Sequence, residues 1–151
     1  MRVVAFDLGE RRIGVAVSAG GLAVPHDTVH RSGDPERDRK ALVAVVEELG
    51  AERVVVGLPL SLDGSRGPAA VKVEAEAAEL AEALSVPVEL VDERLSTVTA
   101  TRSLRAAGVG GRNQRRVVDQ VAATVFLQAW LDGVSGSDGD TASSERTAEG
   151  A

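Results

Sequence analysis

The sequence predicts an α/β fold built around a mixed five-stranded sheet with helices on both faces. Three observations predict it. Three short strand-like segments follow one another near the N-terminus, two helical patterns then alternate with two further strand-like segments, and two more helices follow. Short turns between successive strands favour antiparallel pairing, whereas strands separated by helices pair in parallel. The first three strands are therefore expected to be antiparallel and the last two parallel.

The three N-terminal strands are predicted by their hydrophobic patterns and by one turn. The first is a nearly continuous apolar run, as expected for a strand that is covered on both faces. The second alternates apolar and other side chains, and the third follows the turn signal Gly20-Gly21. We expect these strands at residues 2–8, 12–18 and 22–30.

The remaining elements are predicted by helix start and stop signals. Asp34-Pro35 combines a capping carboxylate with a proline at the first helical position, and Gly50 ends that helix. Pro68 opens a second helix, and Ser96 caps a third. We expect strands at residues 53–58 and 86–92, and helices at residues 35–49, 68–84, 96–108 and 113–131.

Composition indicates one folded domain and a terminal tail. Of the 151 residues, 44% are hydrophobic and only 2% are aromatic, so Val, Leu and Ala must build the core. The last residues of the chain are mostly Gly, Ser, Thr and acids, which cannot bury enough surface to offset the entropy of ordering. We therefore expect a folded domain at residues 1–132 and a disordered, acidic, Gly/Ser-rich tail at residues 133–151.

The same composition limits the chemistry and the location of the protein. Cysteine is absent, which excludes disulfides, a cysteine nucleophile and a Cys-ligated zinc site. His26 and His30 are the only histidines, which disfavours a His-rich metal site. No signal-peptide pattern is visible, and no apolar run approaches the roughly 20 residues of a membrane span. We expect a cytoplasmic protein without membrane contact, either a monomer or a homodimer.

The net charge of −6 does not decide against a nucleic-acid partner, because the charge is unevenly distributed. Residues 102–118 hold five arginines and no acid. A local patch governs contacts to phosphate, whereas net charge governs solubility. An isolated run of this kind is, however, more often a solvated helix face.

Acidic residues at the ends of two strands suggest a cation site. Asp7 ends the first strand, where an acid is costly to bury unless it is paired. Asp92 and Glu93 end the fifth strand, which we expect to be buried, and because successive side chains point to opposite faces, only one of them can join Asp7. Asp119 lies early in the last helix. The pattern leaves the choice between Asp92 and Glu93 open, and each acid could instead cap a turn, pair with an arginine or favour a helix N-terminus.

These acids share one rationale when they are taken together. Phosphodiester hydrolysis needs an activated water and neutralisation of phosphate charge, and hard divalent cations bound by carboxylates supply both. Carboxylates from separate elements can converge at the carboxyl ends of parallel strands. Mg²⁺ or Mn²⁺ is therefore the expected ion. The Gly-punctuated loop 57–67 ends at the same edge and could receive a phosphate on its backbone and on Arg66, although it could equally be an ordinary connection.

Four segments, in order and at fitting spacing, resemble the motifs of the YqgF (RuvX) family. They are the run from Asp7 to Ser18, the V-V-G-L-P-L run that begins at Val55, the D-E-R-L-S-T run that begins at Asp92, and Val118-Asp119 with the apolar positions after it. The likeness covers about residues 2–132. One small departure is Ala19-Gly20, which stands where an acid often follows the serine.

That resemblance implies an RNase H-like fold and a metal-binding set formed by Asp7, Glu93 and Asp119. It thus favours Glu93 over Asp92. Members of the family have been described as Holliday-junction resolvases and as nucleases that mature the 5′ end of 16S rRNA, and the resemblance does not choose between these activities.

We therefore predict a metal-dependent nuclease in which a water activated by the ion attacks phosphorus in line. The favoured substrate is pre-16S rRNA, with branched DNA as the alternative and a non-catalytic RNA-binding assembly factor as a further one. An ATP-using enzyme of the sugar-kinase and actin group shares the Asp-x-Gly opening, but the 1–132 domain leaves no room for its second lobe. The candidates for contacts to the nucleic-acid backbone are Arg11, Arg12, Arg66, Arg112, Arg115 and Arg116.

Overall fold

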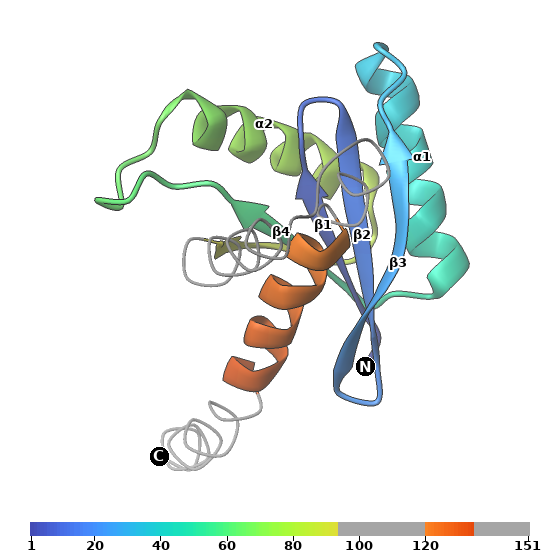
Figure 1. Ribbon diagram of the computed structural model, residues 1–151. Coiled ribbons are helices and arrows are strands. Elements are labelled where there is room, and N and C mark those ends of the chain that lie inside the picture. The colour runs from blue at the N-terminus through green and yellow to red at the C-terminus, as the bar shows by residue number, and fades with distance from the viewer. Residues whose placement is uncertain (94–119, 135–151) are drawn as a thin grey trace, which may run out of the picture.

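The computed structural model describes residues 1–93 and 120–134 and contains the predicted five-stranded sheet (Figure 1). The strand order is β3-β2-β1-β4-β5, with β1, β2 and β3 antiparallel and β1, β4 and β5 parallel. The predicted fold class is confirmed. The helix expected at residues 96–108 and the first residues of the one expected at 113–131 lie outside the described residues. The elements are β1 (Val3–Leu8), β2 (Arg12–Ala19), β3 (Leu22–His30), α1 (Pro35–Leu49), β4 (Arg53–Leu58), α2 (Pro68–Ala83) and β5 (Val88–Asp92).

Local signals set these boundaries in the expected way. Gly20 and Gly21 turn the chain between β2 and β3 with φ values of 59° and 83°, a region that favours glycine. The side chain of Asp34 accepts a hydrogen bond from the backbone N–H of Glu36 at the start of α1. Gly50 ends α1 in the left-handed conformation. The predicted turn, cap and helix stop are therefore confirmed.

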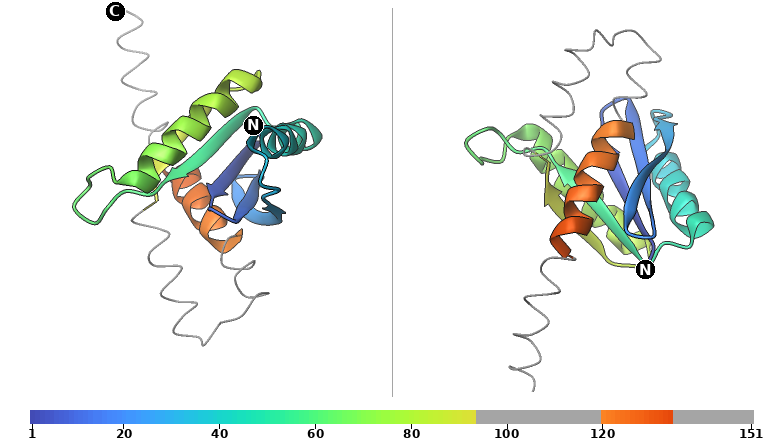
Figure 2. Two further views of the ribbon diagram at one scale, coloured as in Figure 1. Left: turned by 90° about the horizontal axis from the view of Figure 1, so that it is seen from above. Right: turned by 60° about the horizontal axis from the view of Figure 1, so that its bottom comes forward.

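Helices cover both faces of the sheet (Figures 1 and 2). On one face, Phe6 and Ile13 pack with the apolar sides of α1 and α2, from which Leu42 and Leu80 are buried. On the other face, Val3, Ala5, Ala16 and Val55 pack against the helical segment 120–134. The two sets of apolar residues alternate along β1, as the pleat of a strand requires. Each face of the sheet therefore has its own core.

Two expectations about single strands need correction. The alternation in β2 indicated one apolar face, yet Ala16 and Ser18 on the other face are also buried. Ala16 belongs to the core under the segment 120–134, and Ser18 accepts a hydrogen bond from the backbone N–H of Val3 at 2.8 Å. The strand ending at the acids was expected to be buried, but β5 is only partly covered and Leu90 is 37% exposed. The reason is its place at the edge of the sheet, where it pairs with β4 alone among the described strands.

The segment 120–134 is fastened to the sheet at several points. Its residues Ala123, Phe126 and Leu127 are buried against the sheet, and Ala122 is also buried. Gln128 accepts a hydrogen bond from the backbone N–H of Ala23 at 2.7 Å.

A further contact lies toward the end of this segment. The indole N–H of Trp130 donates to Glu89 at 2.7 Å, and the guanidinium of Arg53 lies 5.9 Å from the ring centre. Among the described residues, no helix is both long and apolar enough to cross a membrane.

Phe126→Ala tests how much this docking contributes. Because Phe126 is 1% exposed, the truncation should lower the free energy of unfolding by about 3–5 kcal/mol, as large-to-small changes of aromatic core residues do. Urea unfolding followed by circular dichroism measures the change. The half-exposed Val71→Ala on α2 is the control and should cost less than about 1 kcal/mol. Equal losses in both variants would show that the segment is not part of the core.

Candidate functional site

Asp7 and Glu93 lie on the same face of the sheet at the carboxyl ends of β1 and β5. Asp7 lies on the same face of β1 as Val3 and Ala5, which belong to the core under the segment 120–134. Glu93 directly follows β5 and stands two residues after Val91, which packs against that same core. Asp92 points elsewhere and is exposed. The register of β5 therefore brings Glu93, and not Asp92, toward Asp7.

Gly57 explains how the two carboxylates can approach across β4, the strand that lies between them. A Cβ atom built on Gly57 would lie 2.5 Å from Oε2 of Glu93 and 2.7 Å from Cε2 of Phe126. Both distances are far below ordinary contact. The Glu93 side chain thus occupies the space that any other residue at this position would fill, and the backbone N–H of Glu93 donates to the carbonyl of Leu58 at 3.3 Å.

The Glu93 carboxyl group is held where its charge is disfavoured. Its Oε2 atom is buried and has no hydrogen-bond partner among the described residues. Burial first, and then the charges of Asp7 and Asp92, raise the pKa of Glu93 to about 7. A buried, unpartnered carboxylate oxygen costs free energy unless a cation or a proton accompanies it.

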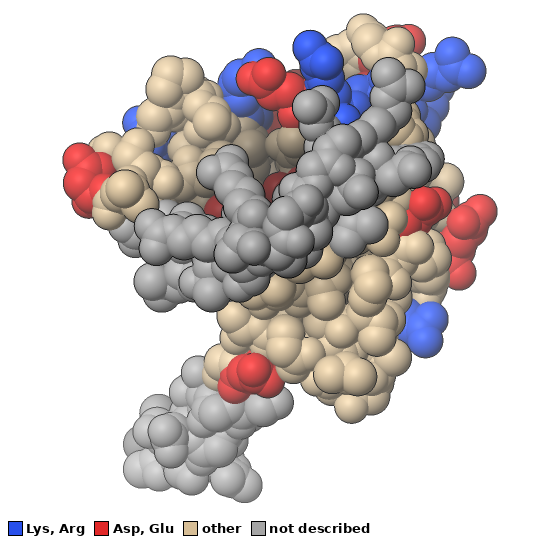
Figure 3. Space-filling model, in the orientation of Figure 1, with Lys and Arg blue, Asp and Glu red and all other residues tan. Residues whose placement is uncertain are grey.

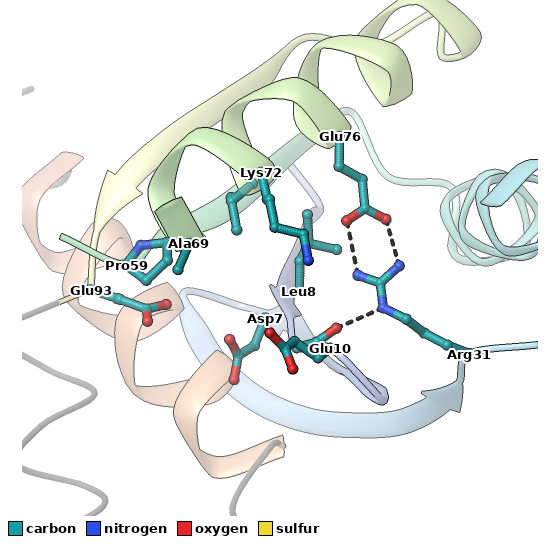
Figure 4. Close-up of a pocket in the computed structure, with 12 residues that line it drawn as sticks. Asp7, Leu8, Glu10, Arg31, Pro59, Ala69, Lys72, Glu76 and Glu93 are labelled. Carbon is teal, nitrogen blue, oxygen red and sulfur yellow. Dashed lines mark hydrogen bonds and ion pairs between the residues drawn. The ribbon is translucent and has the colours of Figure 1, made fainter. Parts of the chain in front are cut away.

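The two acids open into a pocket of about 570 Å³ between the β1–β2 turn, α2 and the end of β4 (Figure 4). Its acidic lining residues are Asp7, Glu10, Glu76 and Glu93, and its basic ones are Arg31 and Lys72. Basic side chains, with acidic ones among them, gather along the upper edge of the space-filling view, which is the end of the sheet where this turn lies (Figures 1 and 3). The pocket is therefore an acidic hollow beside a rim where both charges occur.

Arg31 fastens the turn that follows Asp7. Its Nε donates to the carbonyl of Gly9 at 2.6 Å, and its two terminal nitrogens donate to the two oxygens of Glu76 at 2.9 and 2.8 Å (Figure 4). The hydrogen-bonded Glu76 raises the pKa of the guanidinium, so the ion pair stays charged. This bidentate pair links the end of β3, the β1–β2 turn and α2.

The structure places the other predicted residues less directly. Arg11, Arg12 and Arg66 do not line the pocket, and Arg66 forms an ion pair with Glu74 on α2. Within residues 1–93 and 120–134, no group of three acidic or histidine side chains is placed to hold a metal ion. The metal set therefore stays a prediction, because its third member lies outside the described residues, directly before the segment 120–134. The predicted residues outside the described part are Asp119, Arg112, Arg115 and Arg116.

Sequence reasoning missed Glu10, Arg31, Lys72 and Glu76 as pocket residues. The signal for Arg31 was the hairpin register: Arg12 pairs with His30, so the residue that directly follows β3 reaches the turn after Asp7. The signal for Lys72 was its position one turn into a helix that begins beside the end of β4. To predict that Arg31 and Lys72 line the pocket, one must know which strands and helices lie next to one another, and not only where each lies in the sequence.

Comparisons with known proteins agree with this geometry. Residues 1–133 match the family model described as "RuvX: Holliday junction resolvase". The chain is 50% identical to a protein of Myxococcus xanthus, over 87% of this chain and 88% of that protein. It is 46% identical to one of Chloroflexus aurantiacus over 86% of each chain, and 49% identical to one of Streptomyces avermitilis over 87% and 85%. All three carry the name "Putative pre-16S rRNA nuclease".

Solved structures show the same fold at low sequence identity. Thermus thermophilus RuvC in complex with a Holliday junction substrate superposes with a TM-score of 0.58 at 17% identity, covering 90% of this chain and 96% of that one. A second structure of Thermus thermophilus RuvC gives a TM-score of 0.54 at 14% identity, with coverage of 90% and 97%. The predicted RNase H-like fold is therefore confirmed.

Gly57→Ala should impair the site more than it impairs the fold. The added methyl group displaces the Glu93 carboxylate and presses on Phe126, and misplacement of a reacting group by about 1 Å can cost roughly 100-fold in rate. We expect weaker Mn²⁺ binding by calorimetry and slower cleavage. Gly67→Ala is the matched control, since its φ is −88° and its added Cβ would meet only Ser61 Oγ, at 3.7 Å. Unchanged Mn²⁺ affinity in the Gly57 variant would contradict the assigned contact.

The raised pKa of Glu93 predicts a pH dependence of stability in the absence of metal. The pKa of Glu93 in the folded state is about 7, above the ordinary 4.5, so between these pH values the folded state keeps a proton that the unfolded state has lost. The stability linked to that proton is fully present below pH 4.5 and is lost as the pH rises through about 7. Glu93→Gln should therefore melt above the wild type at pH 8 in EDTA, with the difference vanishing near pH 4.5. Scanning calorimetry across this pH range measures the difference in melting temperature, and the exposed Glu48→Gln is the control. A difference that does not change with pH would contradict the prediction.

Proposed function

Because the chain belongs to the RuvX family, whose members are nucleases, we propose that it is a metal-dependent nuclease that matures the 5′ end of 16S rRNA. The observation that carries the metal-dependent part is that Asp7 and Glu93 line one pocket, with the Glu93 carboxylate over Gly57 and its buried Oε2 without a hydrogen-bond partner among the described residues. The names of relatives that match most of the chain support the ribosomal substrate. The same substrate is consistent with the predicted cytoplasmic location.

The residues at this site fit a hard divalent cation. The unpartnered Oε2 of Glu93 and the charge of Asp7 beside it need a positive group, and carboxylate oxygens are the ligands that Mg²⁺ and Mn²⁺ prefer. Asp7, Glu93 and, from the sequence prediction, Asp119 would hold it. When bound, such an ion neutralises phosphate charge and lowers the pKa of a water.

The chain's own residues then have distinct tasks. Glu93 releases its proton to become a ligand, so metal affinity should fall as the pH drops below about 7. Arg31 holds the Gly9 carbonyl and so keeps the turn after Asp7 in place. Gly57 leaves room for Glu93 to reach Asp7. The predicted arginines position the nucleic-acid backbone without reading its sequence.

Cleavage of a four-way DNA junction is the second candidate function. It is favoured by the description of the matching family model as a Holliday junction resolvase. Cleavage of either candidate substrate uses the same phosphodiester chemistry, so the site does not distinguish between them. A direct comparison of cleavage of the two substrates does. A homodimer would suit symmetrical cleavage of two strands, whereas a monomer would suffice for one RNA strand.

One preparation assayed on two substrates in Mn²⁺ tests the proposal. The substrates are a 16S rRNA precursor fragment with its 5′ extension and a four-way DNA junction. We expect faster cleavage of the RNA, and a loss of at least about 100-fold with Asp7→Asn or Glu93→Gln, since each removes one ligand charge. Asp92→Asn, an exposed neighbour outside the pocket, is the matched control and should stay active.

The other outcomes are also informative. Preferential cleavage of the junction would replace the ribosomal function with the resolvase. Equal cleavage by the wild type and both ligand variants would place the active site elsewhere. Tight RNA binding without cleavage of either substrate would favour a non-catalytic assembly factor.

A further inference from the structure

Lys72 differs from the other cation of the pocket in its charge balance. The charge of Arg31 is neutralised by Glu76, and each of its three nitrogens already donates a hydrogen bond to Gly9 or Glu76. Lys72 lines the same pocket, is exposed, and forms no ion pair with a described residue. Its ammonium group is therefore available to an incoming anion.

The position of Lys72 links two hollows on the surface. A second hollow of about 300 Å³ lies between α1 and α2, next to the acidic pocket of about 570 Å³, and Lys72, Arg31 and Glu76 line both. The second hollow also contains Arg39, which Glu79 neutralises at 3.0 Å. Along this path, among the described residues, Lys72 is the cation that lacks an acidic partner. Figure 4 shows its side chain extending from α2 into the pocket.

An RNA strand that enters this site meets an electrostatic obstacle. Four acids line the pocket, and the whole chain carries a net charge of −6. The cleaved phosphate can be neutralised by the divalent ion, but the phosphates on either side need a cation from the protein. An exposed lysine suits this task, because its compact charge on a flexible stem can follow a phosphate without fixed geometry.

We propose that Lys72 binds the RNA phosphate next to the cleaved one and guides the strand from the acidic pocket into the hollow between α1 and α2. This inference rests on the proposed nuclease function. Lys72 is a substrate-binding residue in this assignment, and it takes no part in holding the metal ion.

The test compares the only two lysines of the chain. Lys72→Met removes the charge and keeps the apolar stem, Lys72→Arg restores the charge, and Lys40→Met on α1 is the matched control, with a side chain that is 77% exposed. RNA affinity is measured in Ca²⁺ over a range of salt concentrations with the 16S precursor fragment, and affinity for the four-way DNA junction is measured in the same way. Mn²⁺ affinity of the free protein is measured by calorimetry.

We expect Lys72→Met to weaken RNA binding by roughly tenfold at low salt and to reduce the slope of log affinity against log salt by about 0.7–0.9. KM should rise more than kcat falls, Lys72→Arg should restore most of the affinity, and Mn²⁺ binding should not weaken. Lys40→Met should behave as the wild type.

Four results would overturn the inference. They are an unchanged salt slope in Lys72→Met, an equal loss in Lys40→Met, a loss of Mn²⁺ affinity, and an effect confined to the four-way DNA junction. Failure of the proposed function is recognised separately, because the wild type itself would then either cleave no substrate or prefer the four-way DNA junction. A Lys72-dependent salt slope for RNA binding would still support the contact in that case.

Discussion

The site depends on one constraint, the close approach of two carboxylates across a strand that has no side chain at the crossing point. Asp7 and Glu93 come from β1 and β5, and β4 separates them. Gly57 makes the approach sterically possible, while burial and mutual repulsion make it costly in the absence of a cation. The folded chain therefore holds the two acids in an arrangement that favours binding of positive charge. Their location at one edge follows from the parallel pairing of these strands.

The rest of the fold keeps that arrangement rigid. The sheet has a core on each face, so the strands that carry the acids cannot shift without disturbing packed side chains. Phe126 closes the site from one side over Gly57, and Arg31 ties the turn after Asp7 to α2 from the other. An acidic pair that repels itself needs such support, because its own interactions would push it apart.

Most of the fold was predictable because its signals are local. The Gly20-Gly21 turn, the Asp34 cap and the glycine that ends α1 each act within a few residues. The site was harder to predict than the fold, because its residues come from distant parts of the chain. Alternation along β5 showed that Asp92 and Glu93 face opposite ways, but the face that meets Asp7 is decided by sheet register and by the helical segment beneath. Arg31 and Lys72 were missed because their role comes from pairing between distant elements, and Asp119 lies outside the described residues.

The docking of the segment 120–134 has a practical consequence. Trp130 is the only tryptophan of the chain, and it sits where this helix meets β4 and β5 through Glu89 and Arg53. Its intrinsic fluorescence is therefore a label-free reporter of that junction. Because Phe126 lies on the same helix over Gly57, a shift in emission wavelength would signal movement of the wall that confines Glu93.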